Sequence, residues 1–452
     1  MAAIAVAVGT FALYRQTLLP GVDFGDSGSM QTLAGWPLLT PRDGYPLYFG
    51  IADVILWLTR LEPAYAMNLT SAIEAALACG LFVLVAAEIG SFLPGAVAGA
   101  VLLAVSYTFW SQSVTAEVYA LHIFFVLATF YCLLKWEQRP TTLRLAVVFA
   151  CYAIGFGNHL SMILLAPAIV VFLFLAEPRG WRRLVSPPVI ALALLIAIAG
   201  ASQYVWNLRT LWIAGDPPAS LWDGLRTFWF DVTKSDWRET MVLNVPQSML
   251  TDHLAMYWFD VRQQFGIAGI AAAAAGFLGL ALGRPRHALL LAVAYACNMA
   301  FAFNYNVGDT HVFYLPAHLM MALAAGAGLP VLIAFIQKER DGLSQATATV
   351  AAVLLGAYAL ARGYHDYPAL DRSDDTRSAQ WLTSFTSGLD ERRNLLLVDL
   401  NWQVANGLSY FTKSVAPDVL VARMPPSIRM VDVPSPVTPT PSFRRKRHSS
   451  TT

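Results

Sequence analysis

The feature that most constrains this chain is a succession of apolar segments, most of them long enough to cross a lipid bilayer. A transmembrane helix needs roughly 17–25 mostly apolar residues to span ~30 Å of hydrocarbon. Segments near this length recur at residues 2–19, 65–88, 93–109, 118–135, 144–158, 160–176, 187–206, 264–283, 287–304, 312–336 and 345–362. The sequence therefore predicts an all-α polytopic membrane protein, a bundle of about eleven transmembrane helices.

The composition supports a membrane protein and excludes other classes. Only 13% of the residues are charged, whereas an ordinary soluble domain carries about a quarter. The formal net charge of +1 provides no electrostatic basis for binding nucleic acid. All four cysteines fall inside apolar segments, so they are predicted to be packing residues and not disulfides or metal ligands.

Basic residues in the connecting segments predict which ends of the helices share a side of the membrane. They form four clusters, each two predicted spans from the next: Lys135, Arg139 and Arg144; Arg179, Arg182 and Arg183; Arg284 and Arg286; Lys338 and Arg340. The positive-inside rule makes this face cytoplasmic. We therefore expect the protein in the cytoplasmic (inner) membrane, with the remaining loops facing the periplasm or cell exterior.

Residues 45–61 are apolar but short, and they decide the sidedness of the first loop. Asp53 lies in their middle, and an acid at the centre of a span costs roughly 2.5–3.5 kcal/mol on insertion scales. We interpret the segment as a juxtamembrane helix in the first external loop, which places Asp23 and Asp26 outside. If the segment crossed the membrane instead, both acids would be cytoplasmic.

The composition also divides the chain. Residues 1–362 hold the transmembrane segments, and the sequence turns polar at about residue 363. Residues 363–432 are predicted to be a small extracytoplasmic segment, with a short strand at L-L-L-V-D-L and a second element after it. Residues 433–452 form a Pro/Ser/Thr-rich basic tail that is predicted to be disordered.

The first external loop reads P-G-V-D-F-G-D-S-G-S-M over residues 20–30. A carboxylate here is a candidate general base, and glycines allow close approach of a substrate to the backbone. The alternative is a glycine-rich turn in which an Asp caps the next helix. A serine hydrolase with Ser27 as nucleophile is disfavoured, because no strand–turn–helix context surrounds the motif.

Other candidate residues fall on the same external face. Glu117 lies where a helix should begin, His159 lies in a turn, and Asp309 follows a glycine in N-Y-N-V-G-D-T-H. Each has an ordinary explanation: a helix-dipole contact, a satisfied histidine and a turn former, respectively. Their agreement on one face indicates a catalytic or binding surface at the membrane boundary, whereas transporters usually place polar groups at mid-bilayer.

Taken in order, these motifs resemble a known family. P-G-V-D-F-G-D-S-G, D-G-Y-P-L-Y, T-F-W-S-Q-S-V-T-A-E-V-Y-A-L, G-F-G-N-H-L-S-M and N-Y-N-V-G-D-T-H-V-F-Y-L-P follow one another here. This order resembles bacterial relatives of the vertebrate endoplasmic-reticulum O-mannosyltransferase that modifies receptor IPT domains. The resemblance runs from about residue 20 to 330, with an echo in L-N-W-Q-V-A-N-G-L-S-Y-F.

The resemblance implies a GT-C-like fold, a lipid-phosphate-linked sugar as donor and catalysis on the lumenal or periplasmic side. It assigns the acid of G-D-S-G to Asp26 as catalytic base, with Glu117 as assistant. The candidate substrate-binding residues are Asp23, Tyr45, His159, Arg209, Asp309 and His311. The chain departs from the family pattern at Ser29, where a glutamate is usual, and at T-P-R-D-G, where H-P-P-G is usual; Arg42 and Asp43 are candidates for the lost polar role.

The expected function is transfer of a sugar, mannose by resemblance, from a polyprenyl phosphate to a hydroxyl acceptor such as a Ser or Thr of a protein. Two alternatives stay open: a lipid or polysaccharide acceptor, and a membrane transporter or flippase. No cofactor is required by the sequence. A divalent metal also stays open, although Asp23 and Asp26 lack the D-x-D spacing of nucleotide-sugar enzymes.

Overall fold

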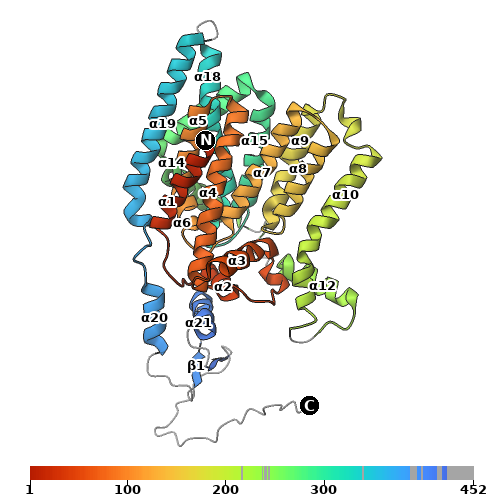
Figure 1. Cartoon of the computed structure of the whole chain (residues 1–452), viewed down its shortest axis with the longest axis vertical. Coiled ribbons are helices and arrows are strands. Elements are labelled where there is room, and N and C mark those ends of the chain that lie inside the picture. Colours follow the sequence, from red (N-terminus) through yellow and green to blue (C-terminus); the bar gives the residue numbers. More distant parts are fainter. Residues whose placement is uncertain are drawn as a thin grey trace, which may run out of the picture.

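The computed structural model describes residues 1–214, 217–236, 238, 242, 245–337, 341–386, 394–398, 401–414 and 420–424. It is a bundle of membrane-length helices with shorter helices gathered at one end (Figure 1). The membrane-bundle helices are α1 (Ala2–Gln16), α4 (Pro63–Gly90), α5 (Leu93–Ala104), α6 (Tyr107–Ser113), α7 (Tyr119–Gln138), α8 (Thr142–Gly155), α9 (Ala166–Ala176), α10 (Pro187–Ala201), α14 (Leu250–Gly283), α15 (Pro285–Phe303), α17 (Leu315–Leu323), α18 (Leu329–Ile336) and α19 (Asp341–Leu370). The other elements are α2 (Gly25–Leu33), α3 (Pro46–Thr59), α11 (Val205–Thr210), α12 (Leu221–Val232), α16 (Thr310–Phe313), α20 (Arg377–Thr386), α21 (Trp402–Ser414), β1 (Asn394–Val398) and β2 (Leu420–Met424).

All eleven predicted transmembrane segments are helical, and the polytopic helical architecture is confirmed. Within the described residues, seven helices are long and apolar enough to cross a membrane: 63–90, 119–138, 187–210, 247–283, 285–303, 315–336 and 344–370. The α5–α6 pair, bent by 67°, would make an eighth. The remaining predicted spans are shorter apolar helices at 2–16, 142–155 and 160–176, so fewer full-length spans occur than the predicted eleven or so.

The two ends of the bundle differ in charge. Three of the predicted basic clusters meet at one end: Lys135 pairs with Glu88, Arg183 pairs with Glu177 at 2.7 Å, and Arg284 donates to Ser91. Lys338 and Arg340 of the fourth cluster lie outside the described residues. The opposite end carries α2, α3, α12, α20 and α21 (Figure 1). Helix α3 belongs to this end, where a juxtamembrane helix was predicted.

The C-terminal segment forms a small mixed unit at that same end. β1 and β2 pair in parallel, with Asn394 opposite Leu420, and α21 connects them. The strand predicted at L-L-L-V-D-L is therefore present, and the second predicted element is divided between the end of α21 and β2. Helix α19 continues to Leu370, beyond the predicted boundary at residue 362. The tail 433–452 lies outside the described residues.

Small residues let the bundle helices approach backbone to backbone. A Cβ atom added to Gly276 of α14 would lie 1.9 Å from the carbonyl oxygen of Ala324, in the π-turn η6 (Ala324–Gly328). A Cβ on Gly328 would lie 2.1 Å from the carbonyl oxygen of Gly276. Membrane helices associate without a hydrophobic force between them, so such close packing is a main source of their cohesion.

Gly276→Ala is therefore expected to destabilise the bundle by about 1–3 kcal/mol, the usual cost of overpacking a tight core. The matched control is Gly356→Ala in α19, where an added Cβ would meet only Ala98, at 3.9 Å. The measurement is the thermal unfolding midpoint of each purified variant in detergent. Equal midpoints for the two variants would contradict the close contact between α14 and η6.

Candidate active site

Asp26 is positioned by a helix that the sequence did not predict. The motif expected as a loop forms α2, which begins at Gly25 with a left-handed φ of +68°. Asp26 lies in the first turn, where the helix dipole favours a negative charge. It does not cap the helix, because the N-cap residue is Phe24. Its side chain reaches solvent, yet the surrounding protein removes hydration and raises the pKa of Asp26, an effect that the charge of Asp309 reinforces.

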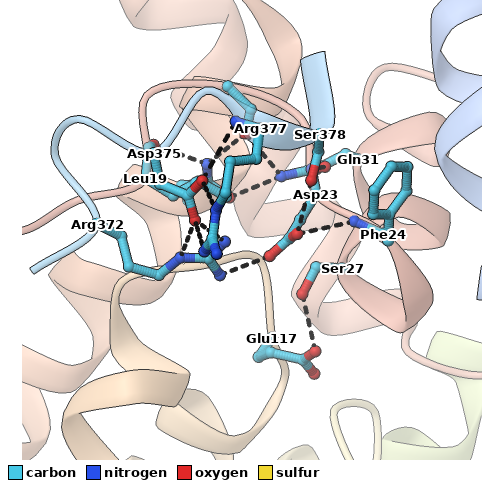
Figure 2. Close-up of polar contacts among 12 residues, drawn as sticks. Leu19, Asp23, Phe24, Ser27, Gln31, Glu117, Arg372, Asp375, Arg377 and Ser378 are labelled. Atoms are coloured by element: carbon cyan, nitrogen blue, oxygen red, sulfur yellow. Dashed lines mark hydrogen bonds and ion pairs between the residues drawn. The ribbon is translucent and has the colours of Figure 1, made fainter. Parts of the chain in front are cut away.

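Glu117 lies beside Asp26, in the connection between α6 and α7, and is 8% exposed. Its Oε1 accepts a hydrogen bond of 3.0 Å from the Ser27 hydroxyl (Figure 2). Its backbone N–H and C=O both bond to the Ser71 hydroxyl, each at 3.1 Å. Burial raises the pKa of Glu117 to about 8, and the charge of Asp26 adds to the rise. Glu117 is therefore mostly protonated at pH 7, next to a more exposed carboxyl.

Asp309 is the third acid of the cluster. It is exposed at the start of α16, and its negative charge acts on both Asp26 and Glu117. Residues from positions 26, 117 and 309 thus meet at one end of the bundle, as the sequence predicted. Like charges in proximity favour keeping a proton among them. The cluster can hold one proton and accept another.

A cation that the sequence analysis missed completes this cluster. Lys234 follows α12 with a left-handed φ of +47°, and its ammonium lies 5.8 Å from the ring centroid of Tyr45. The neighbouring Tyr45 and the charge of Asp26 raise the pKa of Lys234, against the opposing effect of burial. Lys234 is one basic residue in the long loop 207–262, and nothing in its local sequence marks it. Only the tertiary contact identifies it.

Aromatic side chains pack against one another next to Lys234. Tyr45 stacks on His159 with ring centroids 6.0 Å apart, and Tyr119 lies 5.9 Å from the same imidazole. Ser161 Oγ bonds to His159 Nδ1 at 2.6 Å and to His122 Nε2 at 3.1 Å. Burial lowers the pKa of His159 to about 4, and the positive charge of Lys234 adds to this. His159 is therefore a neutral, oriented ring.

An apolar cavity of about 420 Å³ lies along α3. Its lining comes from α3 and from the segment just before and within α11: Pro46, Leu47, Gly50, Ile51, Val54, Ile55, Gln203 and Trp206. Gln203 is the main polar side chain among them. The first of these residues, Pro46, directly follows Tyr45, whose ring contacts Lys234.

Comparisons with known proteins agree with this architecture. A family model described as the Protein O-mannosyl-transferase TMEM260 N-terminal domain matches residues 40–182. The mouse Protein O-mannosyl-transferase TMEM260 is 28% identical over 233 residues, which cover 47% of this chain and 32% of that protein. The chain thus spans about a third of the length of this curated relative.

Solved structures share the fold. ArnT from Cupriavidus metallidurans, bound to undecaprenyl phosphate, matches with a TM-score of 0.59 at 13% identity, covering 93% of this chain and 88% of ArnT. The oligosaccharyltransferase AglB from Archaeoglobus fulgidus, in complex with an inhibitory peptide and a dolichol-phosphate, matches with a TM-score of 0.55 at 14% identity, covering 93% of this chain and 64% of AglB. The chain shares the polytopic helical fold of these two membrane proteins, and its residues 40–182 match the TMEM260 N-terminal domain. The resemblance predicted from its motifs is confirmed.

The match to the TMEM260 domain covers only part of the candidate site. Tyr45, Glu117 and His159 lie within residues 40–182, whereas Asp26, Lys234 and Asp309 lie outside them. The site is therefore assembled from both the matched segment and later parts of the chain.

Three of the predicted substrate-binding residues make no direct contact with the charged cluster among the described residues. Asp23 forms an ion pair of 2.6 Å with Arg372 of the C-terminal segment. Arg209 on α11 and His311 on α16 are exposed, and neither makes a hydrogen bond, ion pair or ring contact with the cluster within the described residues. Arg42, a candidate for the lost polar role, pairs with Asp231 and Asp236.

A metal ion has no prearranged ligand set in the part of the chain that the structure describes. No group of three or more His, Cys, Asp or Glu side chains is placed there to hold one.

The raised pKa of Glu117 predicts a pH-dependent stability. The native protein retains the Glu117 proton up to about pH 8, whereas the unfolded chain loses it near the ordinary value of 4.5. Wild-type stability should therefore fall as the pH rises through this window. Glu117→Gln, which cannot ionise, should lack this fall, and its melting temperature relative to wild type should rise by more than about 3 °C between pH 5 and pH 9.

The measurement is thermal unfolding of both proteins in the same detergent at each pH. The control is Glu62→Gln at the exposed start of α4, whose carboxylate accepts the Tyr65 N–H. A constant difference between wild type and Glu117→Gln at all pH values would contradict a neutral Glu117.

Proposed function

We propose that this protein is a membrane glycosyltransferase that moves a sugar from a polyprenyl-phosphate donor to a hydroxyl acceptor. The observation that carries the proposal is the meeting of Asp26, the buried protonated Glu117 and Lys234 at one end of a GT-C bundle, beside an apolar cavity. Such a donor has a charged phosphate joined to a long apolar chain. A cation next to an apolar groove matches both parts of it.

The mechanism assigns one role to each group. The acceptor oxygen forms a bond to the anomeric carbon as the bond from that carbon to the phosphate oxygen breaks, and the electron pair leaves with the lipid phosphate. Asp26 takes the proton of the acceptor hydroxyl. Lys234 stabilises the negative charge that grows on the departing phosphate. Direct attack from the opposite face inverts the anomeric centre.

Glu117 supports Asp26 in this mechanism. Its protonated carboxyl lies close enough to Asp26 for the charge of Asp26 to raise the pKa of Glu117, and Ser27 holds its Oε1 in place. Asp309 adds negative potential to the same region. Burial and the charge of Asp309 make Asp26 a stronger base than a solvated aspartate, because a raised pKa brings the proton affinity of Asp26 closer to the working pH.

The donor class has support from the structural relatives as well as from the cavity. The matching ArnT structure holds undecaprenyl phosphate and the matching AglB structure holds a dolichol-phosphate. By analogy, the cavity along α3 binds the first isoprene units of the donor, and Tyr45 lies where the isoprenoid chain joins the phosphate. The name of the mouse relative, a protein O-mannosyl-transferase, supports mannose as the sugar and a hydroxyl of a protein Ser or Thr as the acceptor. The basic clusters at the opposite end of the bundle support an extracytoplasmic location of the site.

Asp26→Asn is expected to reduce sugar transfer by about 100-fold or more, because the base is lost while the shape is kept. The assay supplies polyprenyl-phosphate mannose, radiolabelled in the sugar, to purified protein in lipid nanodiscs with a Ser/Thr-rich polypeptide acceptor. Asp252→Asn, at an exposed position in the first turn of α14, is the matched control and should retain full activity. Equal transfer by Asp26→Asn and wild type would remove Asp26 from the mechanism.

Lys234→Gln is expected to raise the KM for the donor and to weaken inhibition by free undecaprenyl phosphate, each by about 10-fold, because a charge-assisted phosphate contact is lost. Lys234→Arg should recover part of both. Arg226→Gln, exposed on α12, is the control for the net change in charge. Unchanged inhibition in Lys234→Gln would exclude Lys234 from the phosphate site.

A further inference from the structure

The helix that carries Asp26 is covered by the C-terminal helix α21 (Figure 1). Glycines permit the approach. A Cβ on Gly28 of α2 would lie 3.2 Å from the backbone nitrogen of Gly407, and a Cβ on Gly407 would lie 2.7 Å from the Phe24 ring. An apolar cluster beneath the contact includes Val22, Leu382 and Tyr410. The two segments are nearly 400 residues apart in the sequence, so this contact exists only in the folded protein.

Directed polar contacts tie both ends of α2 to α21. The Asn406 side-chain amide donates a hydrogen bond of 3.0 Å to the carbonyl oxygen of Gly25, the residue before Asp26. At the other end, the Lys413 ammonium donates to the carbonyl oxygen of Thr32. α2 has nine residues, and a helix this short is not stable by itself. Its position therefore depends on these contacts.

An ion pair anchors the chain just before α2. Arg372 Nη1 lies 2.6 Å from Asp23 Oδ2, and Asp375 holds the same guanidinium through contacts of 2.6 and 3.1 Å (Figure 2). The other Asp23 oxygen accepts the Phe24 N–H at 2.9 Å and the Ser378 hydroxyl at 3.3 Å. Both oxygens of the Asp23 carboxylate are thus engaged by the protein, which leaves Asp23 poorly suited to bind substrate.

We propose that the described parts of the C-terminal segment, residues 371–386 and 401–414, are a positioning element of the active site. The Asp23–Arg372 ion pair and the Asn406–Gly25 hydrogen bond clamp the two sides of the turn into α2 and fix Asp26 against Glu117. Asp23 acts through Asp26 and not by contact with substrate. The inference rests on the proposed function for its kinetic consequences, whereas its structural consequence, an ordered α2, is independent of that function.

The first test is a double-mutant cycle on the ion pair. Asp23→Asn, Arg372→Gln and the double variant are expected to lose about 10- to 100-fold in kcat, with the KM values for donor and acceptor nearly unchanged, because a displaced base affects the chemical step. The double variant should be no worse than the poorer single variant, since both remove one contact. Asn406→Ala should show the same pattern. Asp252→Asn, at an exposed position in the first turn of α14 and outside this segment, is the control and should retain full kcat.

The second test uses hydrogen exchange and needs no activity. In Arg372→Gln, the amides of α2 should exchange faster than in wild type, while those of α4 stay unchanged. Unchanged hydrogen exchange in α2 would overturn the inference. Three kinetic results would also overturn it: full kcat in all three variants of the cycle, additive losses of kcat across the cycle, or a raised KM with an unchanged kcat. An inactive wild type with the expected exchange would instead refute the proposed function and leave the clamp supported.

Discussion

The lipid bilayer is the constraint on which the rest of this structure depends. Hydrocarbon cannot hydrogen-bond to the backbone, so each segment that crosses it must satisfy its own peptide groups, as a helix does. Charged side chains are then confined to the ends of the bundle or must be paired. Inside the bundle, His318 Nε2 lies 2.8 Å from Asp260 Oδ2, and Gln264 donates to the other oxygen of Asp260. Asp26, Glu117 and Asp309 lie at one end of the bundle, near the termini of α2, α6 and α16.

Within that end, charge and burial act on one another. Glu117 is buried and keeps a proton, whereas Asp26 reaches solvent and Lys234 offsets its charge. The same Lys234 disfavours a charge on His159, which lies behind Tyr45. One cation therefore helps to ionise an acid and to keep a histidine neutral. The site thus contains one carboxylate that can accept a proton, Asp26, and one carboxyl group that is already protonated, Glu117.

The C-terminal segment contacts the turn before α2, and its sequence alone did not predict this contact. Asp23 lies three residues before Asp26, the acid of G-D-S-G, yet its carboxylate pairs with Arg372. Asp26 is exposed in the first turn of α2, so the proximity of the two acids in the sequence did not imply that they share contacts. In the proposed mechanism, this stretch supplies one carboxylate for chemistry, Asp26, and one for anchoring, Asp23.

The sequence by itself determined the helical membrane fold, the end at which the acids gather, and Asp26, Glu117 and Asp309 as members of one cluster. These features could be predicted because the length of the apolar segments and the distribution of basic residues can be read directly from the sequence, and because the order of the motifs is shared with proteins of the same fold. Only the tertiary structure decided that Lys234 joins them, that Asp23 does not, and that α21 covers α2. Each of these contacts joins segments that are far apart in the sequence, through close glycine packing or a single ion pair. Neither hydrophobic periodicity nor composition indicates which distant segments will come into contact.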